Sequence, residues 1–191
     1  MFQKKIIYSL FLGAALIGCR PANLKDYDKP YFDFDSLVNI QIKKFSQGTH
    51  SVEKTSALDG KHDVSSFKID STHLAHEWDV FRQLDWINKP IYKGNYAVTE
   101  KADAKSNLMI RSYVAKVKSP IPFVHFYFKD NFKNLKKIES QYEETNTLYY
   151  TNRKLSMTFD ENLIHQYSIE GSQKLILSDS VKFSIIGRIF F

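Results

Sequence analysis

The segment LSMTFD, residues 155–160, carries the pattern that decides the fold of this 191-residue chain. Its first, third and fifth residues are apolar, and the residues between them are polar. Successive side chains of a β-strand point to opposite faces of a sheet, so this alternation predicts a strand with one buried and one solvated face. Such half-buried strands are typical of antiparallel sheets.

The same period of two recurs from Tyr92 to the C-terminus. Further strands are predicted in SNLMIRSYVAKV (106–117), IPFVHFYFKD (121–130), TLYYTN (147–152), LIHQYSIEG (163–171), QKLILSD (173–179) and SVKFSIIGRIFF (180–191). The short link Glu170-Gly171-Ser172 predicts a hairpin turn. Residues 132–144, FKNLKKIESQYEE, fit either an amphipathic helix or another strand.

The first half of the chain predicts two helices. Asp35 or Ser36 can cap a helix that runs to about Gln47, with apolar residues three to four positions apart. Ser71 or Thr72 can cap a second helix that runs to about Asn88. The apolar stripe of this second helix comprises Leu74, Trp78, Phe81, Leu84 or Asp85, and Ile87.

A hairpin is predicted between the two helices, because Asp59-Gly60 separates two β-prone runs and suits a type I′ turn. We therefore expect an α+β fold, in which two N-terminal helices pack on a large curved antiparallel sheet of about seven to nine strands. A small β-barrel with flanking helices is the alternative.

The N-terminus has the features of an export signal. Lys4 and Lys5 precede a mostly apolar, uncharged run over residues 6–17. This run is shorter than the roughly 20 residues that cross a bilayer, but it suits the hydrophobic region of a signal peptide. Leu16-Ile17-Gly18-Cys19 resembles the lipobox of bacterial lipoproteins. The resemblance implies cleavage between Gly18 and Cys19, and acylation of Cys19, the only cysteine of the chain.

The lipobox resemblance also implies a place in the cell. Arg20 follows the cysteine, where an aspartate marks retention in the inner membrane. We therefore expect the protein to be anchored by lipid in the outer membrane, on either its periplasmic or its surface face. Residues 1–18 would be the signal peptide, residues 19–34 the lipidated cysteine and a tether, and residues 35–191 a single domain. With no second cysteine, its core alone must hold that domain together.

A second resemblance covers Asp85-Trp86-Ile87-Asn88-Lys89-Pro90 with Gly94 and Tyr96. It is similar to a D-x-x-N-K-P…G-x-Y stretch in small bacteroidete lipoproteins, and the resemblance itself implies no particular activity. By their residue types, Asn88 to Pro90 would end a helix, and Gly94 would let the chain turn into a strand. Docking of a partner at this corner is the alternative.

Two histidine segments could carry chemistry. His73, His76 and Glu77 would share one face of a helix and are candidates for metal binding, although the H-E-x-x-H pattern is absent and we expect no metal. His125, in FVHFYF, is interpreted as a hydrogen-bonded histidine of the sheet. The sequence contains no G-x-S-x-G, phosphate-loop or G-x-G-x-x-G motif, and we expect no cofactor.

Charge and export together limit the partners. Removal of the signal peptide with its two lysines lowers the formal net charge from +6 to +4. The basic residues are scattered, so no nucleic acid partner is expected. We expect a lipid-anchored, non-catalytic binding or interaction module of the envelope, with an unknown protein or ligand as partner. A carrier of an apolar molecule and an envelope enzyme of unknown class are the alternatives.

Overall fold

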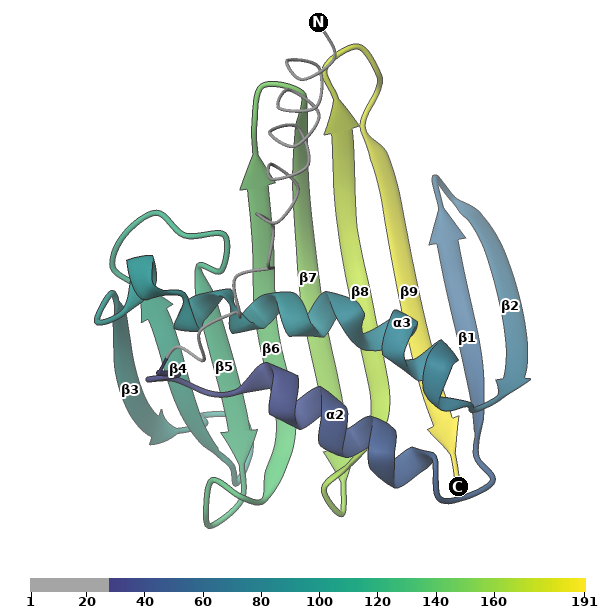
Figure 1. Ribbon diagram of the computed structural model, residues 1–191, viewed down its shortest axis with the longest axis horizontal. Helices are drawn as coiled ribbons and strands as arrows, with labels where there is room; N and C mark the ends of the chain where they lie inside the picture. Colours follow the sequence, from purple (N-terminus) through teal and green to yellow (C-terminus); the bar gives the residue numbers. More distant parts are fainter. Residues whose placement is uncertain (1–27) are drawn as a thin grey trace, which may run out of the picture.

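A computed structural model describes residues 28–191 as two layers, a pair of helices packed across one face of a nine-stranded sheet (Figure 1). Every neighbouring pair of strands is antiparallel, in the order β2-β1-β9-β8-β7-β6-β5-β4-β3. Strands β2 and β3 are the two edges, so the sheet is open and does not close into the alternative small barrel. The predicted α+β fold is confirmed.

The strands run along the chain in a simple sequence. A hairpin comes first, and a seven-stranded meander follows the second helix; the last strand then pairs with the first. The strands are β1 (Ser51–Leu58), β2 (Lys61–Lys68), β3 (Tyr96–Ala102), β4 (Met109–Ala115), β5 (Phe123–Phe128), β6 (Leu135–Thr145), β7 (Tyr149–Asp160), β8 (Leu163–Leu175) and β9 (Val181–Phe190).

Both helices begin earlier than predicted. Helix α2 (Phe34–Phe45) has Asp33 as its N-cap, whose carboxylate accepts a hydrogen bond from Ser36 N at 2.9 Å. Helix α3 (Ser71–Arg82) is capped by Asp70. The predicted caps at Asp35 or Ser36 and at Ser71 or Thr72 are therefore wrong by one to three residues, because an aspartate just before each site takes the capping position.

The second predicted helix is only partly α-helical. After Arg82 the chain tightens into two 3-10 helices, η2 (Gln83–Asn88) and η3 (Pro90–Tyr92). The predicted stripe nevertheless faces the sheet, and its members Leu74, Trp78, Phe81, Leu84, Asp85 and Ile87 are all buried.

The predicted turns had mixed outcomes. Asp59 and Gly60 both have positive φ, 46° and 82°, as a type I′ turn requires, so the β1–β2 hairpin is confirmed. The ambiguous segment 132–144 contains most of strand β6. The hairpin turn at Glu170-Gly171-Ser172 is wrong, because these residues lie inside β8. A Cβ at Gly171 would lie 2.2 Å from Asn152 O, so this glycine permits close approach of two strands.

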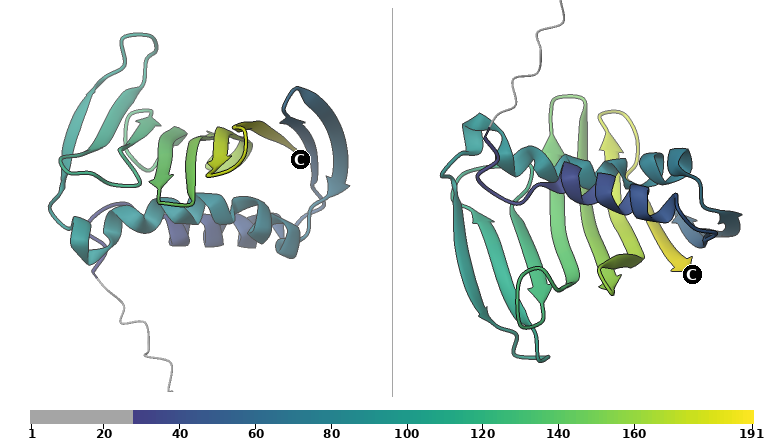
Figure 2. Two further views of the ribbon diagram at one scale, coloured as in Figure 1. Left: turned by 90° about the horizontal axis from the view of Figure 1, so that it is seen from above. Right: turned by 60° about the horizontal axis from the view of Figure 1, so that its bottom comes forward.

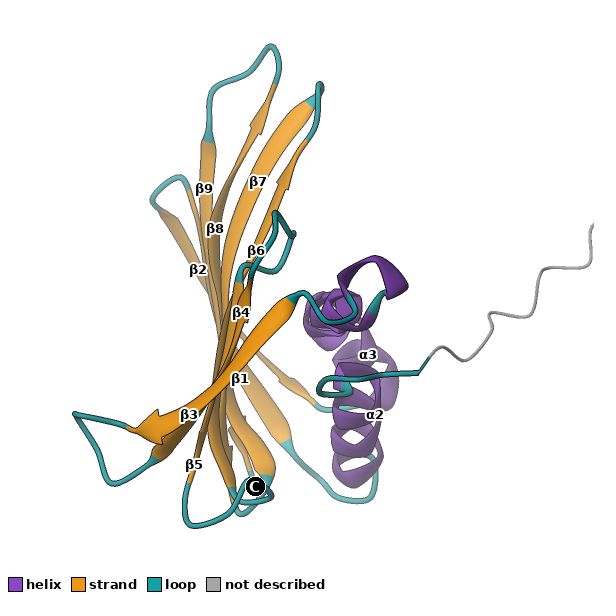
Figure 3. Ribbon diagram, turned by 90° about the vertical axis from the view of Figure 1, so that its left-hand side faces the viewer, coloured by secondary structure: helices purple, strands orange, loops and turns teal. Residues whose placement is uncertain are grey.

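The two layers leave one face of the sheet bare. Helices α2 and α3 run side by side on one side of the twisted, curved sheet (Figure 2), and no helix of the described chain covers the other side (Figure 3). The covered face carries the core; in β5, for example, Val124, Phe126 and Phe128 are buried while the residues between them are half-buried. None of the described helices has the length and apolar character needed to span a membrane.

Part of the expected tether is packed against this core. Phe34 is buried, and Tyr31 and Phe32 pack beside it, so the folded unit extends at least to Lys29. The signal peptide, Cys19 and the rest of the tether lie outside the described residues.

Candidate functional site

The bare face of the sheet contains a groove over its central strands. The groove has a volume of about 330 Å³ and crosses β5, β6, β7 and β8. Ser156 and Ser168 are direct cross-strand partners and short, so the surface is low between the larger side chains around them. The lining residues are Phe123, His125, Glu139, Ser140, Gln141, Lys154, Leu155, Ser156, Ser168 and Glu170.

A continuous row of polar residues runs across this groove. Ser112 lies opposite His125, His125 opposite Glu139, and Glu139 opposite Ser156, so four neighbouring strands contribute to one line of side chains. Since directly opposite residues share a face, all of them point away from the helices. The antiparallel register alone brings them together.

His125 is held in place by two neighbours. Its Nδ1 lies 2.9 Å from Ser112 Oγ in a hydrogen bond, and its ring stacks on Phe123 with the centroids 4.6 Å apart. Burial lowers the pKa of His125, although the negative charge of Glu139 acts against this shift. The imidazole is therefore neutral at pH 7, and with Phe123 it presents an uncharged aromatic platform.

Glu139 is an ionised carboxylate with its own partners. Tyr127 donates its hydroxyl hydrogen to Glu139 Oε2 at 2.7 Å, and Lys137 Nζ lies 2.5 Å from Oε1. Burial would raise the pKa of Glu139, but the hydrogen bonds from Lys137 and Tyr127 outweigh it and hold that pKa below its usual value. Burial and the hydrogen bond to Glu139 raise the pKa of Tyr127 to about 12.

These groups suit binding better than bond cleavage. A serine, a histidine and a glutamate occur together, as in a hydrolase triad, but Ser112 is buried, so a substrate carbonyl has little access to its hydroxyl. Glu139 accepts from Tyr127 and Lys137, with no hydrogen bond to His125 among those of the described chain. The groove thus offers a flat aromatic surface ringed by hydroxyl, amide and charged groups.

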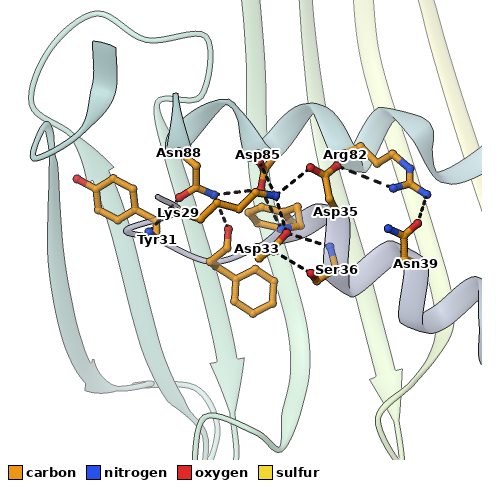
Figure 4. A network of polar contacts seen from close by, with 11 residues as sticks. Lys29, Tyr31, Asp33, Asp35, Ser36, Asn39, Arg82, Asp85 and Asn88 are labelled. Atoms are coloured by element: carbon orange, nitrogen blue, oxygen red, sulfur yellow. Dashed lines mark hydrogen bonds and ion pairs between the residues drawn. The ribbon is translucent and has the colours of Figure 1, made fainter. Parts of the chain in front are cut away.

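A second polar cluster joins the start of the described chain to helix η2. Carboxylate oxygens of Asp33, Asp35 and Asp85 lie within 4.8 Å of one another, the only such convergence of potential metal ligands found over residues 28–191. Lys29 Nζ contacts all three, at 2.7, 2.9 and 3.0 Å (Figure 4). An ammonium group thus supplies the positive charge that a metal ion would otherwise bring.

Asp85 and Asn88 attach the segment before α2 to the same cluster. Asp85 Oδ1 accepts from Phe34 N at 3.2 Å. Asn88 accepts from Tyr31 N and donates to Phe32 O, both at 2.9 Å, much as a neighbouring strand would. Asp85 and Asn88 therefore have a structural role, which is to hold the segment before α2.

The pKa values of Lys29 and Asp33 are both shifted by their hydrogen bonds in this cluster. Burial acts to lower the pKa of Lys29, but the hydrogen bonds to Asp33, Asp35 and Asp85 outweigh it and raise that pKa. Burial acts to raise the pKa of Asp33, but hydrogen bonds from Lys29 and Ser36 lower it. We call Lys29, Asp33, Asp35, Asp85 and Asn88 the latch.

The three candidate metal ligands of helix α3 do not converge. His73 is exposed and pairs with Asp70 at the helix N-terminus. Glu77 forms an ion pair with Lys54 and accepts a hydrogen bond from the Tyr167 hydroxyl at 3.1 Å. His76 lines a shallow groove beside Glu77, between α3 and the sheet. Each of the three side chains has its own surroundings, so the helical spacing alone does not bring them together as metal ligands.

Comparison with known proteins adds no relative, because no protein-family model, curated protein or solved structure matches the chain. The bare-face groove is therefore interpreted from its own geometry.

Proposed function

We propose that this chain is a lipid-anchored protein of the cell envelope, held in the outer membrane by acylated Cys19, and that its domain is a non-catalytic binding module. The observation that carries the binding role is the groove on the bare face of the sheet. Two helices bury one face of nine strands, while the other face keeps a hollow of about 330 Å³ whose polar groups are fixed in place.

The packing of the interior favours a binding surface over an internal carrier of apolar molecules. Large side chains fill the space between helices and sheet. Trp78, Tyr167, Phe34, Phe45, Phe81 and Phe126 are each at most 1% exposed. A carrier would need that volume for its cargo, whereas a binding module needs a rigid scaffold behind an accessible face.

The anchor is tested by replacing the lipobox cysteine. Cys19→Ser removes the thiol that would receive the lipid, so the variant should remain an unprocessed precursor with a serine at position 19. Mass spectrometry of the protein from membrane fractions should show a lipidated N-terminus at Cys19 for the unaltered chain alone. An unmodified N-terminus in that chain, or one at another residue, would refute the anchor.

The binding face is tested by photocrosslinking in intact cells. A benzoylphenylalanine at Phe123 places the reactive group in the bare-face groove, and we expect a discrete adduct of higher mass. The matched control is the same group at Ile40, which is exposed on α2, on the other side of the molecule. Adducts at neither position, or equally at both, would contradict the assignment of this face.

A further inference from the structure

Four exposed aliphatic side chains lie together on two neighbouring hairpins. Leu148 in the β6–β7 turn is 66% exposed, and Ile176 and Leu177 in the β8–β9 turn are 62% and 95% exposed. Leu175, the last residue of β8, is exposed beside them. Aliphatic groups this exposed on adjacent loops mark a contact surface.

The two turns form one continuous tip. Ile176 N donates a hydrogen bond to Leu148 O at 2.9 Å, which joins the hairpins at their ends. The long strands β6 to β9 carry this tip beyond both helices, at the top of Figure 1. We call Leu148, Leu175, Ile176 and Leu177 the apolar tip.

The two ends of the sheet differ in chemistry. Because neighbouring strands alternate in direction, the connections β1–β2, β4–β5, β6–β7 and β8–β9 all lie at the end that carries the apolar tip. Each of these connections has an exposed aliphatic residue in it or beside it. For the β1–β2 connection this residue is Leu58, and for the β4–β5 connection it is Val117. The opposite connections, 103–108, 129–134 and 161–162, carry no large exposed aliphatic side chain. The exposed Phe190 and Phe191 at that opposite end belong to the C-terminus, and Phe191 stacks on Phe45.

The tip end carries a small excess of basic residues. In its connections and the two adjoining residues of each strand, the lysines are Lys61, Lys116, Lys118, Lys174 and Lys182, and the acids are Asp59, Glu144 and Asp179. Aliphatic side chains that protrude from a surface with flanking lysines match the boundary of an anionic bilayer, where the apolar groups enter the acyl region and the ammonium groups meet phosphates.

The described chain begins near the start of β3, on the side of the sheet that carries the helices and well below the apolar tip in Figure 1. Lys93, just before β3, lies 3.1 Å from Asp28 in an ion pair. Tyr96 N, in the first residue of β3, donates to the Tyr31 hydroxyl. Asp28 is nine residues after Cys19 in the sequence, and such a segment spans at most about 30 Å when extended. An anchor at Cys19 would therefore hold the start of the described chain within about 30 Å of the bilayer.

We propose that the apolar tip inserts into the surface of an anionic lipid bilayer and sets the domain upright on the membrane. The occupant is the lipid surface rather than a protein, because the apolar groups sit on narrow protruding turns and the surrounding charge complements anionic headgroups. This inference rests on the proposed lipid anchor for its location, but the chemistry of the tip is independent of acylation.

The test places an environment-sensitive dye on the tip of the full chain. In a Cys19→Ser background, Leu177→Cys is labelled with a nitrobenzoxadiazole dye and mixed with vesicles of phosphatidylethanolamine and phosphatidylglycerol. Emission should shift to the blue and rise by about threefold as the dye leaves water for the acyl region. Adding Ile176→Glu should weaken this response by about tenfold or more, because a carboxylate replaces a buried aliphatic group.

The matched control carries the same dye at Val64→Cys, an exposed aliphatic position in the middle of β2, and its emission should not change. A rise at both positions, or at neither, would overturn the tip assignment. Vesicles of phosphatidylcholine alone should give a weaker response, and an equal response would refute the role of the lysines. Since the background lacks Cys19, failure here leaves the mass test of the anchor unaffected.

Discussion

Replacing Lys29 by methionine is expected to lower the free energy of unfolding by about 3 kcal/mol or more, because it removes the ammonium group that pairs with the buried carboxylate of Asp85. Asp85 is only 5% exposed, and Lys29 Nζ lies 3.0 Å from its Oδ2. Methionine keeps most of the aliphatic length of lysine, so the loss reports on charge rather than on packing. Urea unfolding followed by circular dichroism measures the difference.

Lys93→Met is the matched control for the latch variant. Lys93 also pairs with an aspartate, Asp28, but both side chains are exposed, so the expected loss is below about 0.5 kcal/mol. Equal losses in the two variants would show that the latch contributes no more than a surface pair.

The latch should also make stability depend on pH. The pKa of Asp33 is lowered in the folded protein from its ordinary value of 3.8. Its contribution is therefore present above pH 3.8 and is lost as the pH falls through the lower folded value. The difference between the unaltered chain and Lys29→Met should shrink over that acidic range.

Replacing Phe126 by alanine is expected to cost about 3–5 kcal/mol, the usual range for removal of a buried phenylalanine. Its ring is fully buried, and its centroid lies 4.8 Å from that of Phe32, 5.2 Å from Tyr113 and 5.4 Å from Phe132. The cavity would therefore open where the segment before α2 meets the sheet. Thermal or urea unfolding measures the loss.

Phe190→Ala is the control for the core variant. Phe190 lies near the end of β9 and is half exposed, so its removal should cost about 1 kcal/mol or less. A loss as large as that of Phe126→Ala would mean that the aromatic cluster around Phe126 contributes no special share of the core energy.

Periodicity predicted the layers of this fold because burial follows it closely. The alternation around Leu155 and the helical stripe from Leu74 each correspond to one buried face. The helix starts were missed because several adjacent residues are good caps. Asp33 caps α2 and also pairs with Lys29, whose ammonium group contacts Asp85 of η2 as well, so the choice of cap depends on a tertiary contact that local preference does not contain.

The groove was beyond prediction for a related reason. The sequence predicts that His125 is a histidine of the sheet. Its neighbours Ser112 and Glu139 belong to other strands and lie opposite it only because of the register of the meander. The available signal was that these residues all occupy polar positions in the strand pattern. Gly171 shows the same limit, because a glycine that lets two strands approach looks like a turn in the sequence.

The pairing of β1 with β9 has a kinetic consequence. Ser51 lies opposite Phe190, so the first strand of the sheet has no partner on that side until the last residues of the chain are present. Contacts between segments this far apart form slowly, because a long loop must close before they stabilise the structure. Under the proposed export across a membrane, the sheet would thus stay incomplete until β9 had crossed.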